Sequence, residues 1–483
     1  MTSRGIWVDG AERAGRGANT LEVTNPFDGS LIGRITTAST EDVGDAVASA
    51  AAAFETRMKP LARYERAAIL RRTAQIIRDG HDELVDIVVA EAGKPIRDVR
   101  REIGRASTFL DLTADYVMVQ QGQVVPMDVV ESGVNRTGFA TRVPLGVIVA
   151  IAPSNSPVNL TINKVAPALG VGNTVVVKPA DQTPFSALWL AEAFTKAGLP
   201  DGCFNVVIGG IDEVAEPLVK DRRVRMVSLT GSVAAGLAVS RVAGIKKLTL
   251  ELGSSSANVV CSDADITTAA QSLATSAYLS SGQACISAQR LIVHKSVIDD
   301  FVAQFTRFAE GMVIGDPRDP RTEIGPMVSQ AHVDLVLGWI EEASQGGASV
   351  LTGGHKVGRT IAPTLIADVP ASATLATAEA FATVAVLQTF ETDEEAIALA
   401  NDSVYGLQAG VFTNDLTRAF RLSEGIDAGA VWVNESSRYR QDNYPFGGMK
   451  QSGVGREGVQ YAMEEMSDWK FTGFKRGPSN GIL

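Results

Sequence analysis

Residues 173–198, NTVVVKPADQTPFSALWLAEAFTKAG, place a short valine-rich run directly before a longer segment in which apolar residues recur at helical spacing. The first run is typical of a buried strand and the second of a helix. The same alternation continues on both sides, in VPLGVIVAIAP, CFNVVIG, VRMVSLTG and KKLTLEL. Alternating strands and helices predict right-handed βαβ units and a parallel sheet with helices on both faces. Ligands of such sheets bind beyond the carboxyl ends of the strands.

A second alternating stretch begins near Gly253 and extends to about Gly429. It opens with a helical pattern, DITTAAQSLATSAYLS, followed by a strand pattern, RLIVH, and a further helix, VIDDFVAQFTRFAEGM. Residues 40–118 are mostly helical in pattern, whereas residues 119–139 alternate polar and apolar residues around Gly and Pro, as a protruding hairpin does. We therefore expect an α/β protein with two doubly wound parallel-sheet domains and a small β element for interaction with partners.

The composition argues against several classes of function. The chain has 483 residues and a formal net charge of −11, whereas a nucleic-acid-binding protein normally presents a basic face. Its longest apolar runs are about half of the roughly 20 residues that a membrane span requires. The N-terminus shows no signal or transit pattern, and three widely spaced cysteines with four histidines fit no zinc motif. We expect a cytoplasmic protein with no metal, nucleic-acid or membrane partner.

One cysteine, Cys285, lies in a loop of small and polar residues, LSSGQACISAQR, at residues 279–290. A structural cysteine usually lies among apolar neighbours and behaves as a small hydrophobe. A reactive cysteine needs access to substrate and a group that draws off its proton. The loop favours the reactive kind but does not decide the matter by itself.

Polar candidates follow four of the predicted strands. The Asn155 amide could stabilise an oxyanion, or it could serve the turn between two prolines. The turn Gly231–Ser232 opens a helix and suits a pyrophosphate, although a plain glycine turn has the same pattern. Lys178 and Asp181 could meet a ribose or form a solvated turn. Glu251, within an apolar strand, could be a base with a raised pKa or a surface carboxylate. Taken singly, the structural explanation is favoured for Asn155, the glycine turn and Glu251, whereas for Lys178 and Asp181 both explanations stay open.

In combination and in this order, these stretches resemble the aldehyde dehydrogenase superfamily over nearly the whole chain. The matching segments are IAPSNSP, NTVVVKPADQTP, SLTGSVAAG, LELGSSSANVV, GQACISAQR, AEAFATVAVLQTF and YPFGGMKQSGVGREG. The resemblance implies the aldehyde dehydrogenase-like fold and a homodimer or homotetramer. It implies a cofactor-binding domain at 1–118 and 140–251, a catalytic domain at 252–446, and an oligomerisation element at 119–139 and 465–483.

By this resemblance, Cys285 is the nucleophile that attacks the aldehyde to give a thiohemiacetal and then a thioester. Asn155 and the Cys285 backbone N–H hold the oxyanion, and Glu251 activates the water that releases the acid. NAD accepts the hydride, with NADP as the other possibility. The implied cofactor contacts are Lys178 and Asp181 at the adenine ribose, Gly231 and Ser232 at the pyrophosphate, and Glu379 and Phe381 at the nicotinamide. A carboxylate at Asp181 opposes a 2′-phosphate and favours NAD.

The chain departs from the family pattern at three places. Ser154 replaces the large aromatic residue that usually precedes the asparagine, and Ser254 replaces the second glycine after the base. The usual Glu-x-Phe-Gly-Pro ends here in Ala382-Thr383, which changes the φ and ψ angles that the loop can adopt. We therefore expect unusual cofactor affinity.

The segment NESSRYRQDNYPFGG, residues 434–448, resembles the branch of the family that acts on small polar aldehydes such as lactaldehyde and phosphonoacetaldehyde. Phe446 would line the aldehyde tunnel. The arginines that could bind an anionic substrate group are Arg105, Arg290, Arg438 and Arg440, and structural ion pairs are the alternative for each. Two other functions stay open: a CoA-acylating semialdehyde dehydrogenase, and a catalytically weakened protein that keeps the fold for binding.

Overall fold

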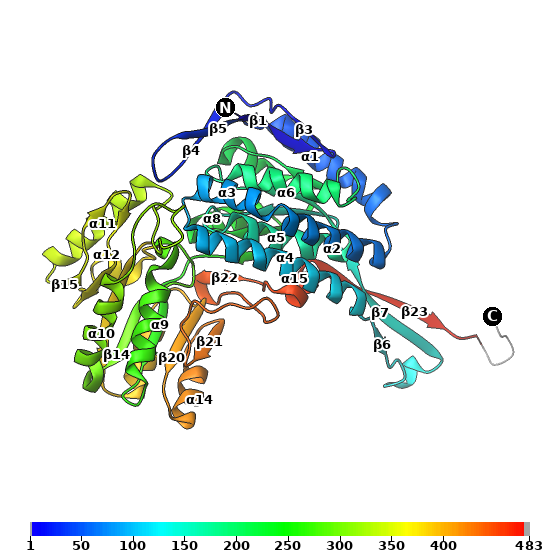
Figure 1. The fold of residues 1–483 in the computed structure, drawn as a ribbon. Helices are drawn as coiled ribbons and strands as arrows, with labels where there is room; N and C mark the ends of the chain where they lie inside the picture. Colours follow the sequence, from blue (N-terminus) through cyan, green and yellow to red (C-terminus); the bar gives the residue numbers. More distant parts are fainter. Residues whose placement is uncertain (1, 478–483) are drawn as a thin grey trace.

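Five parallel strands form the centre of the larger sheet in the computed structural model, which describes residues 2–477 (Figure 1). The Val-rich and Leu-rich runs form these strands because helices bury both faces of the sheet. Segments from both ends of the chain extend its edges in antiparallel orientation. The order across the sheet is β22 (Gly453–Val454), β12 (Lys247–Glu251), β11 (Val224–Thr230), β8 (Val147–Ile151), β9 (Thr174–Lys178), β10 (Phe204–Val206), β2 (Ile6–Val8) and β3 (Ala11–Arg13).

Helices cover both faces of this sheet, as the sequence predicted. On one face two helices contact the strands, and three further helices pack against those two. The helices of this face are α5 (Pro157–Val171) and α6 (Pro184–Lys196), then α2 (Arg63–Asp79), α3 (His81–Ala92) and α4 (Ile96–Val119). The opposite face is covered by α1 (Thr40–Ala53), α7 (Glu216–Lys220) and α8 (Val233–Val242). The core of this part of the molecule lies between these layers.

The second predicted α/β unit is also present, with a sheet that is parallel except at one edge. Its strands in order are β15 (Ser349–Thr352), β18 (Thr364–Ala367), β19 (Val384–Phe390), β14 (Ala288–His294), β13 (Ser256–Val260), β20 (Gln408–Phe412) and β21 (Ala430–Val433). Its helices are α9 (Ile266–Tyr278), α10 (Ile298–Glu310), α11 (Gln330–Gln345), α12 (Thr374–Thr377), α13 (Asp393–Asn401) and α14 (Leu416–Gly425). The expected architecture of two parallel-sheet units is therefore confirmed.

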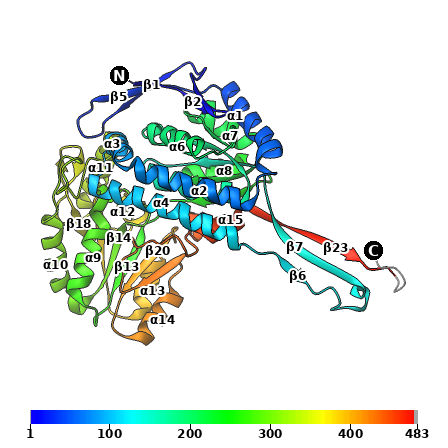
Figure 2. The ribbon, with the colours of Figure 1, turned by 45° about the vertical axis from the view of Figure 1, so that its right-hand side comes forward.

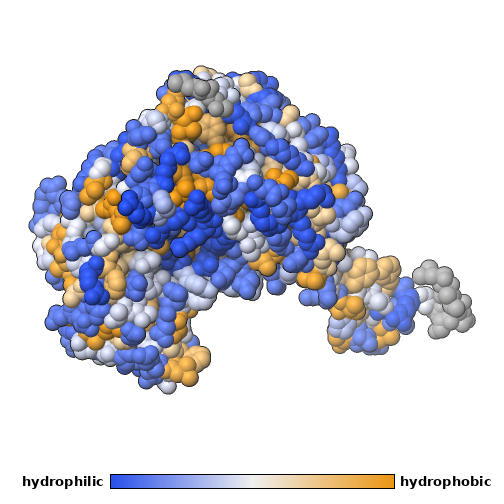
Figure 3. All heavy atoms as spheres, viewed as in Figure 1, coloured by the Kyte–Doolittle hydropathy of each residue, from blue (hydrophilic) through white to orange (hydrophobic). Residues whose placement is uncertain are grey.

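A three-stranded antiparallel arm projects from the body of the molecule (Figures 1 and 2). It consists of β6 (Gln123–Val125), β7 (Arg136–Pro144) and β23 (Ser467–Lys475). Apolar side chains are exposed along it and give the patches of Figure 3; they include Val124, Val129, Phe139, Phe471 and Phe474. Two small sheets complete the strands: β1 (Thr2–Arg4), β5 (Leu31–Thr36) and β4 (Thr20–Thr24) in one, and β16 (Lys356–Val357) with β17 (Thr360–Ile361) in the other.

The C-terminal part of the chain returns to the first sheet, a feature that the sequence did not reveal. After Phe446 the chain forms β22 beside β12, and then α15 (Val459–Glu465) packs on α5. Without a further strand, the backbone groups on the outer side of β12 would lack partners, and the returning segment satisfies them. One of these hydrogen bonds, from Leu252 N to Ser452 O, is 2.9 Å long. Strand β7 also runs across the boundary that we expected at residue 139.

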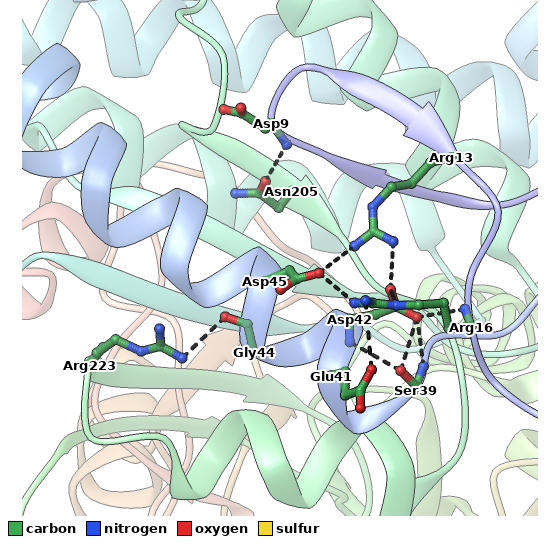
Figure 4. A network of polar contacts seen from close by, with 10 residues as sticks. All are labelled: Asp9, Arg13, Arg16, Ser39, Glu41, Asp42, Gly44, Asp45, Asn205 and Arg223. Carbon is green, nitrogen blue, oxygen red and sulfur yellow. Dashed lines mark hydrogen bonds and ion pairs between the residues drawn. The ribbon is translucent and has the colours of Figure 1, made fainter.

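The N-terminal segment is fastened to α1 by one buried carboxylate (Figure 4). Asp42 accepts hydrogen bonds from Arg13 Nη1 at 2.6 Å, Arg16 Nε at 2.8 Å, and the backbone N–H groups of Arg16 and Ser39 at 2.7 and 3.0 Å. Burial raises the pKa of Asp42, but these hydrogen bonds outweigh that effect and bring the pKa down to about 2. The ionised carboxylate is therefore part of the folded structure at neutral pH.

Replacing Asp42 by Asn is expected to lower the free energy of unfolding by about 2 kcal/mol, because two arginines and two N–H groups lose a charged acceptor. Since the pKa is lowered, this stabilisation is present above about pH 4 and fades as the pH falls toward 2. Urea titrations of wild type and Asp42→Asn at pH 7 and at low pH measure both effects. The control is Asp45→Asn, because Asp45 pairs with the same two arginines but is half-exposed. An equal loss of unfolding free energy in Asp45→Asn would contradict the prediction.

Candidate active site

Four predicted site positions lie at the carboxyl ends of neighbouring strands. Glu251 is the last residue of β12 and Lys178 is the last residue of β9. Asn155 follows β8, and Ser232 follows β11 as the N-cap of α8. Because β12, β11, β8 and β9 are adjacent and parallel, these residues share one edge of the sheet. This is the edge at which ligands of such sheets bind.

The Cys285 loop reaches this edge from the second unit, between α9 and β14. Ser280 and Ser281, which precede Cys285 in this loop, have φ angles of 54° and 59°, a backbone conformation that residues other than glycine rarely adopt. Ser281 Oγ donates to the Gly325 carbonyl at 2.8 Å and helps to hold this strained turn. Asn155 Nδ2 donates to the Gln283 carbonyl at 2.8 Å, which joins the loop to the first sheet.

Glu251 is buried beside Cys285, with 1% of its surface exposed. Neither of its carboxylate oxygens accepts from a nitrogen or oxygen donor among the described residues, and the Cys285 thiol is the group that it faces. Burial and the nearby charge of Glu457 raise the pKa of Glu251 to about 7. A carboxylate with this pKa takes and releases a proton near neutral pH, as a general base must.

The Cys285 thiol is partly exposed, and the pKa of Cys285 is raised well above its ordinary value by burial and by the Glu251 carboxylate. The resting side chain is therefore a thiol, and attack on a substrate requires a proton acceptor. Glu251 is the acceptor at hand. Cys203 and Cys261 are buried among apolar side chains, and burial raises the pKa of each to about 12.

A buried cluster that we did not predict lies next to this pair. Lys164 Nζ contacts Glu457 Oε1 at 2.6 Å, and Arg440 Nη2 contacts Glu457 Oε2 at 2.8 Å. Burial raises the pKa of Glu457, but the two cations outweigh burial and lower it to about 2. A lysine within the buried helix α5 was the sequence signal for this cluster, and Glu457 lies in the GVGREG segment.

A second ion pair holds the loop that carries Asn155. Lys94 Nζ contacts Glu102 Oε2 at 2.7 Å and donates to Ser156 Oγ at 3.0 Å. Glu102 Oε1 accepts the backbone N–H groups of Val158 and Asn159, the free donors at the start of α5. Helix α4 therefore fixes the turn from β8 into α5, and with it the asparagine.

Glu102→Gln is expected to reduce kcat about tenfold, because a shifted asparagine loses part of its stabilisation of developing negative charge. Lys94→Met is expected to act similarly, and the double variant should lose little more than either single one. Steady-state rates with saturating cofactor measure these effects. The control is Glu323→Gln, which removes a partly exposed partner of Arg97, a residue of α4. If the losses of kcat in Glu102→Gln and Lys94→Met added up in the double variant, the two residues would not act together on Asn155.

The predicted cofactor residues form a consistent set. Lys178 Nζ contacts Asp181 Oδ1 at 3.0 Å at the end of β9. Ser232 caps α8, where free backbone N–H groups and the positive end of the helix dipole suit a pyrophosphate. A Cβ at Gly231 would meet no atom closer than 3.7 Å, so the protein itself does not require glycine there. The donor set and the open turn fit a dinucleotide.

The loop with Ala382-Thr383 is held by other means than the usual Gly-Pro. Gln289 Nε2 donates to Ala378 O at 2.7 Å, and Ala380 N donates to Gln289 Oε1 at 2.8 Å. Phe381 has a φ of 46°, and Thr383 Oγ1 donates to Ile361 O at 2.6 Å. The conformation is therefore built into the fold, although its sequence departs from the family pattern.

Glu379 lies against Gly253 and Ser254, the segment that follows β12. Its Oε1 accepts the Ser254 N–H at 3.1 Å, and burial raises the pKa of Glu379 to about 7. A Cβ at Gly253 would lie 2.2 Å from Glu379 Oε2, so a side chain at this position would displace the Glu379 carboxylate.

All four arginines bond to the protein through their guanidinium groups, Arg440 through Glu457 as described above. Arg290 donates to the carbonyls of Ser255, Leu399 and Ala400, and Arg438 donates to Leu279 O at 3.0 Å. Arg105 holds Asp442 with two hydrogen bonds. The structural alternative that we gave for these residues accounts for their contacts.

Arg440 differs from the other three in one respect, which is that one of its buried nitrogens has no partner among the described residues. Its guanidinium lies 3.7 Å from the centre of the Phe446 ring, and the unpartnered nitrogen is Nε. Phe446 is fully buried and packs in one cluster with Cys285. Arg440 is thus the arginine that retains a donor near the cysteine.

The family model of the aldehyde dehydrogenase family matches residues 13–472. The chain belongs to the aldehyde dehydrogenase family. It is 38% identical to a 3-sulfolactaldehyde dehydrogenase of Priestia aryabhattai over 96% of each chain, and 36% identical to a lactaldehyde dehydrogenase of Methanocaldococcus jannaschii over 93% of this chain and 96% of that one. The solved NAD-dependent aldehyde dehydrogenase from Sinorhizobium meliloti has a TM-score of 0.95 at 33% identity, covering 99% of this chain and 97% of that one.

The protein is accordingly an oxidoreductase of this family with NAD or NADP as its cofactor, because its solved neighbours include members with each bound. Within residues 2–477 no group of His, Cys, Asp and Glu side chains could hold a metal ion. None of the helices described here is long and apolar enough to cross a membrane.

Proposed function

We propose that this aldehyde dehydrogenase oxidises a small polar or anionic aldehyde to its free carboxylic acid through a thioester at Cys285. The observation that carries the proposal is the buried carboxylate of Glu251, which faces the thiol, has no nitrogen or oxygen donor and has a pKa of about 7. This group can activate water, so CoA is not needed to release the product.

In the first step the Cys285 sulfur bonds to the aldehyde carbon as Glu251 takes the thiol proton. The carbonyl electron pair moves to oxygen, and the Asn155 amide donates a hydrogen bond to the resulting oxyanion. Asn155 must turn from the Gln283 carbonyl, or share its two N–H groups, to do so. A neutral donor stabilises the oxyanion without trapping it as an ion pair.

A bound nicotinamide cofactor would supply the acceptor for the hydride that leaves the thiohemiacetal carbon. Lys178, Asp181, Gly231 and Ser232 would hold the adenine ribose and pyrophosphate, and Glu379 and Phe381 would hold the nicotinamide end. Asp181 favours NAD over NADP, because its carboxylate repels a 2′-phosphate.

Before the second half of the reaction Glu251 releases the thiol proton to solvent and is again a carboxylate. It then takes a proton from water, and the hydroxide bonds to the thioester carbon. The carbon–sulfur bond then breaks, and the Cys285 sulfur leaves with the electron pair and is protonated again. The Lys164–Glu457–Arg440 cluster keeps Glu457 ionised. That fixed negative charge raises the pKa of Glu251 and so improves it as a base.

The substrate class is supported by the site and by the relatives. The buried Nε of Arg440 and Oδ1 of Asn155 are unpartnered polar atoms near the cysteine. Relatives at 34–40% identity include enzymes named for sulfolactaldehyde, lactaldehyde and aspartate semialdehyde. Each of these aldehydes is short and carries a hydroxyl or charged group. An apolar aldehyde would leave the buried donor unsatisfied.

The proposal is tested with lactaldehyde, glycolaldehyde, phosphonoacetaldehyde and succinate semialdehyde against hexanal and benzaldehyde, each with NAD and NADP. We expect kcat/KM at least tenfold higher for the polar set, and the free acid as product with or without CoA. Higher kcat/KM for hexanal or benzaldehyde would contradict the substrate class. An acyl-CoA product would favour the CoA-acylating alternative, and no turnover at all would favour the binding-protein alternative.

The arm supports assembly into a homodimer or homotetramer. It projects from the body and exposes apolar side chains, such as Val124 at 82% and Phe474 at 53% exposure, that a second copy would cover. Light scattering at micromolar concentration measures the mass in solution, and a monomer would contradict this assembly.

A further inference from the structure

Strands β7 and β23 leave the body at the root of the arm (Figure 2). A cavity of about 480 Å³ is lined there by residues of both strands. No Asp or Glu lines it among the described residues. Five cationic side chains, those of Lys59, Arg63, Arg66, Arg142 and Lys470, line this one cavity, although the chain as a whole has a net charge of −11. The lining side chains that carry hydrogen-bond donors are Lys59, Arg63, Arg66, Gln120, Arg142, Ser467 and Lys470.

The charge of Arg66 at this cavity has no nearby carboxylate to offset it. Its Nε and Nη1 donate to the carbonyls of Gly170 and Leu61, at 3.0 and 2.7 Å. Burial and the like charge of Arg63 lower the pKa of Arg66. Neutral carbonyls orient the guanidinium but leave its charge uncompensated, which favours the arrival of an anion.

The other donors of the cavity are held in different ways, and Lys59 forms an ion pair with Glu55. Arg142 Nη1 donates to the Glu464 carbonyl at 3.1 Å, and its guanidinium lies 4.3 Å from the centre of the Trp469 ring. Gln120 Nε2 is buried with no hydrogen-bond partner among the described residues. An orphaned buried donor is unfavourable unless a ligand or water satisfies it. Both observations indicate a ligand rich in acceptor oxygens.

This cavity is separate from the candidate active site. It is lined by Val171 and Gly172 at the C-terminal end of α5, whereas Asn155 precedes the N-terminal end of the same helix. The 15 residues of α5 span about 22 Å. The cavity also adjoins Pro144 and Leu145, which precede β8, at the opposite edge of the sheet from the cofactor residues.

We propose that this cavity binds a phosphate-bearing small molecule. Phosphate groups carry several acceptor oxygens and more than one negative charge, and arginine forks match their geometry. The volume lies within the range of small-molecule sites in proteins. The proposal does not rest on the nature of the aldehyde, because none of these residues belongs to the active site.

The test uses the full-length protein with saturating NAD, so that the cofactor site is occupied. Pyrophosphate and tripolyphosphate are titrated by calorimetry and by thermal shift at constant ionic strength set with NaCl. We expect both to bind and to raise Tm, and Lys59→Gln/Lys470→Gln to weaken binding at least tenfold. These exposed lysines hold no core contact, so the variant is expected to fold.

Lys196→Gln/Lys356→Gln is the matched control, because it removes the same charge from two exposed lysines in surface ion pairs elsewhere. Its affinity for pyrophosphate should equal that of wild type. Equal weakening in the two double variants would overturn the proposal. The proposal would also be overturned if pyrophosphate and tripolyphosphate raised Tm no more than NaCl does at the same ionic strength. That result is expected if a second copy of the chain fills the cavity. Aldehyde oxidation by wild type is measured separately and reports on the proposed function alone.

Discussion

Cys285→Ala is expected to abolish aldehyde oxidation, with a loss of kcat of at least about 10⁴-fold. Without the sulfur no thiohemiacetal forms, and the oxyanion donors and the base have no covalent intermediate to act on. The rate of NADH formation, monitored by absorbance, measures this loss of kcat. Binding of NADH, followed by its fluorescence, should be retained, because none of the proposed cofactor residues changes.

Cys261→Ala is the control for this variant. Cys261 is buried in the second unit, and burial raises the pKa of Cys261 to about 12, so it is not expected to supply a nucleophile. The control should keep wild-type kcat, with at most a modest loss of stability from the small cavity. Residual turnover in Cys285→Ala close to that of Cys261→Ala would refute the covalent mechanism.

Glu251→Gln is expected to slow steady-state turnover by about 10²- to 10⁴-fold, the usual contribution of a general base. If Gln leaves enough of the first half-reaction, rapid mixing should show a burst of reduced cofactor followed by a slow phase, because the thioester accumulates. The matched control is Glu391→Gln, at an exposed carboxylate paired with Lys295. A Glu251→Gln enzyme with wild-type turnover would exclude this residue as the base.

The same residue predicts a pH profile. The base works only when ionised, and the pKa of Glu251 is about 7, so turnover limited by hydrolysis should rise through neutral pH. Between pH 6 and pH 8 the ionised fraction increases about tenfold. Removing Glu457 should move the midpoint to lower pH, because its negative charge raises the pKa of Glu251. Glu457→Gln that leaves the midpoint unchanged would contradict this coupling.

Local sequence was enough to predict the two parallel-sheet units. Runs such as TVVVK are buried on both faces and can satisfy their backbone only in a central strand, and the following segments bury one face at helical spacing. The candidate residues at the strand ends followed from the same reasoning, because parallel strands end at one edge. Their roles required the resemblance to the family.

The arginines show where sequence reasoning fell short. Arg290, Arg438 and Arg105 were equivalent candidates in the sequence, yet each is engaged by carbonyls or by Asp442 in the folded chain. Hydrogen bonds between residues more than 100 positions apart have no local signature, and so Arg440 could not be singled out in advance.

The sequence by itself determined the strands, the helices and the chemical types of the reacting groups, because burial periodicity and residue chemistry are local properties. Only the tertiary structure decided how those groups behave. Glu251 has a pKa near 7 because the fold buries it and places Glu457 beside it, and Lys164 with Arg440 keeps that neighbour charged. Charge and desolvation depend on distance in space, and residues 164, 251 and 457 come together only when α5, β12 and the returning C-terminal segment pack.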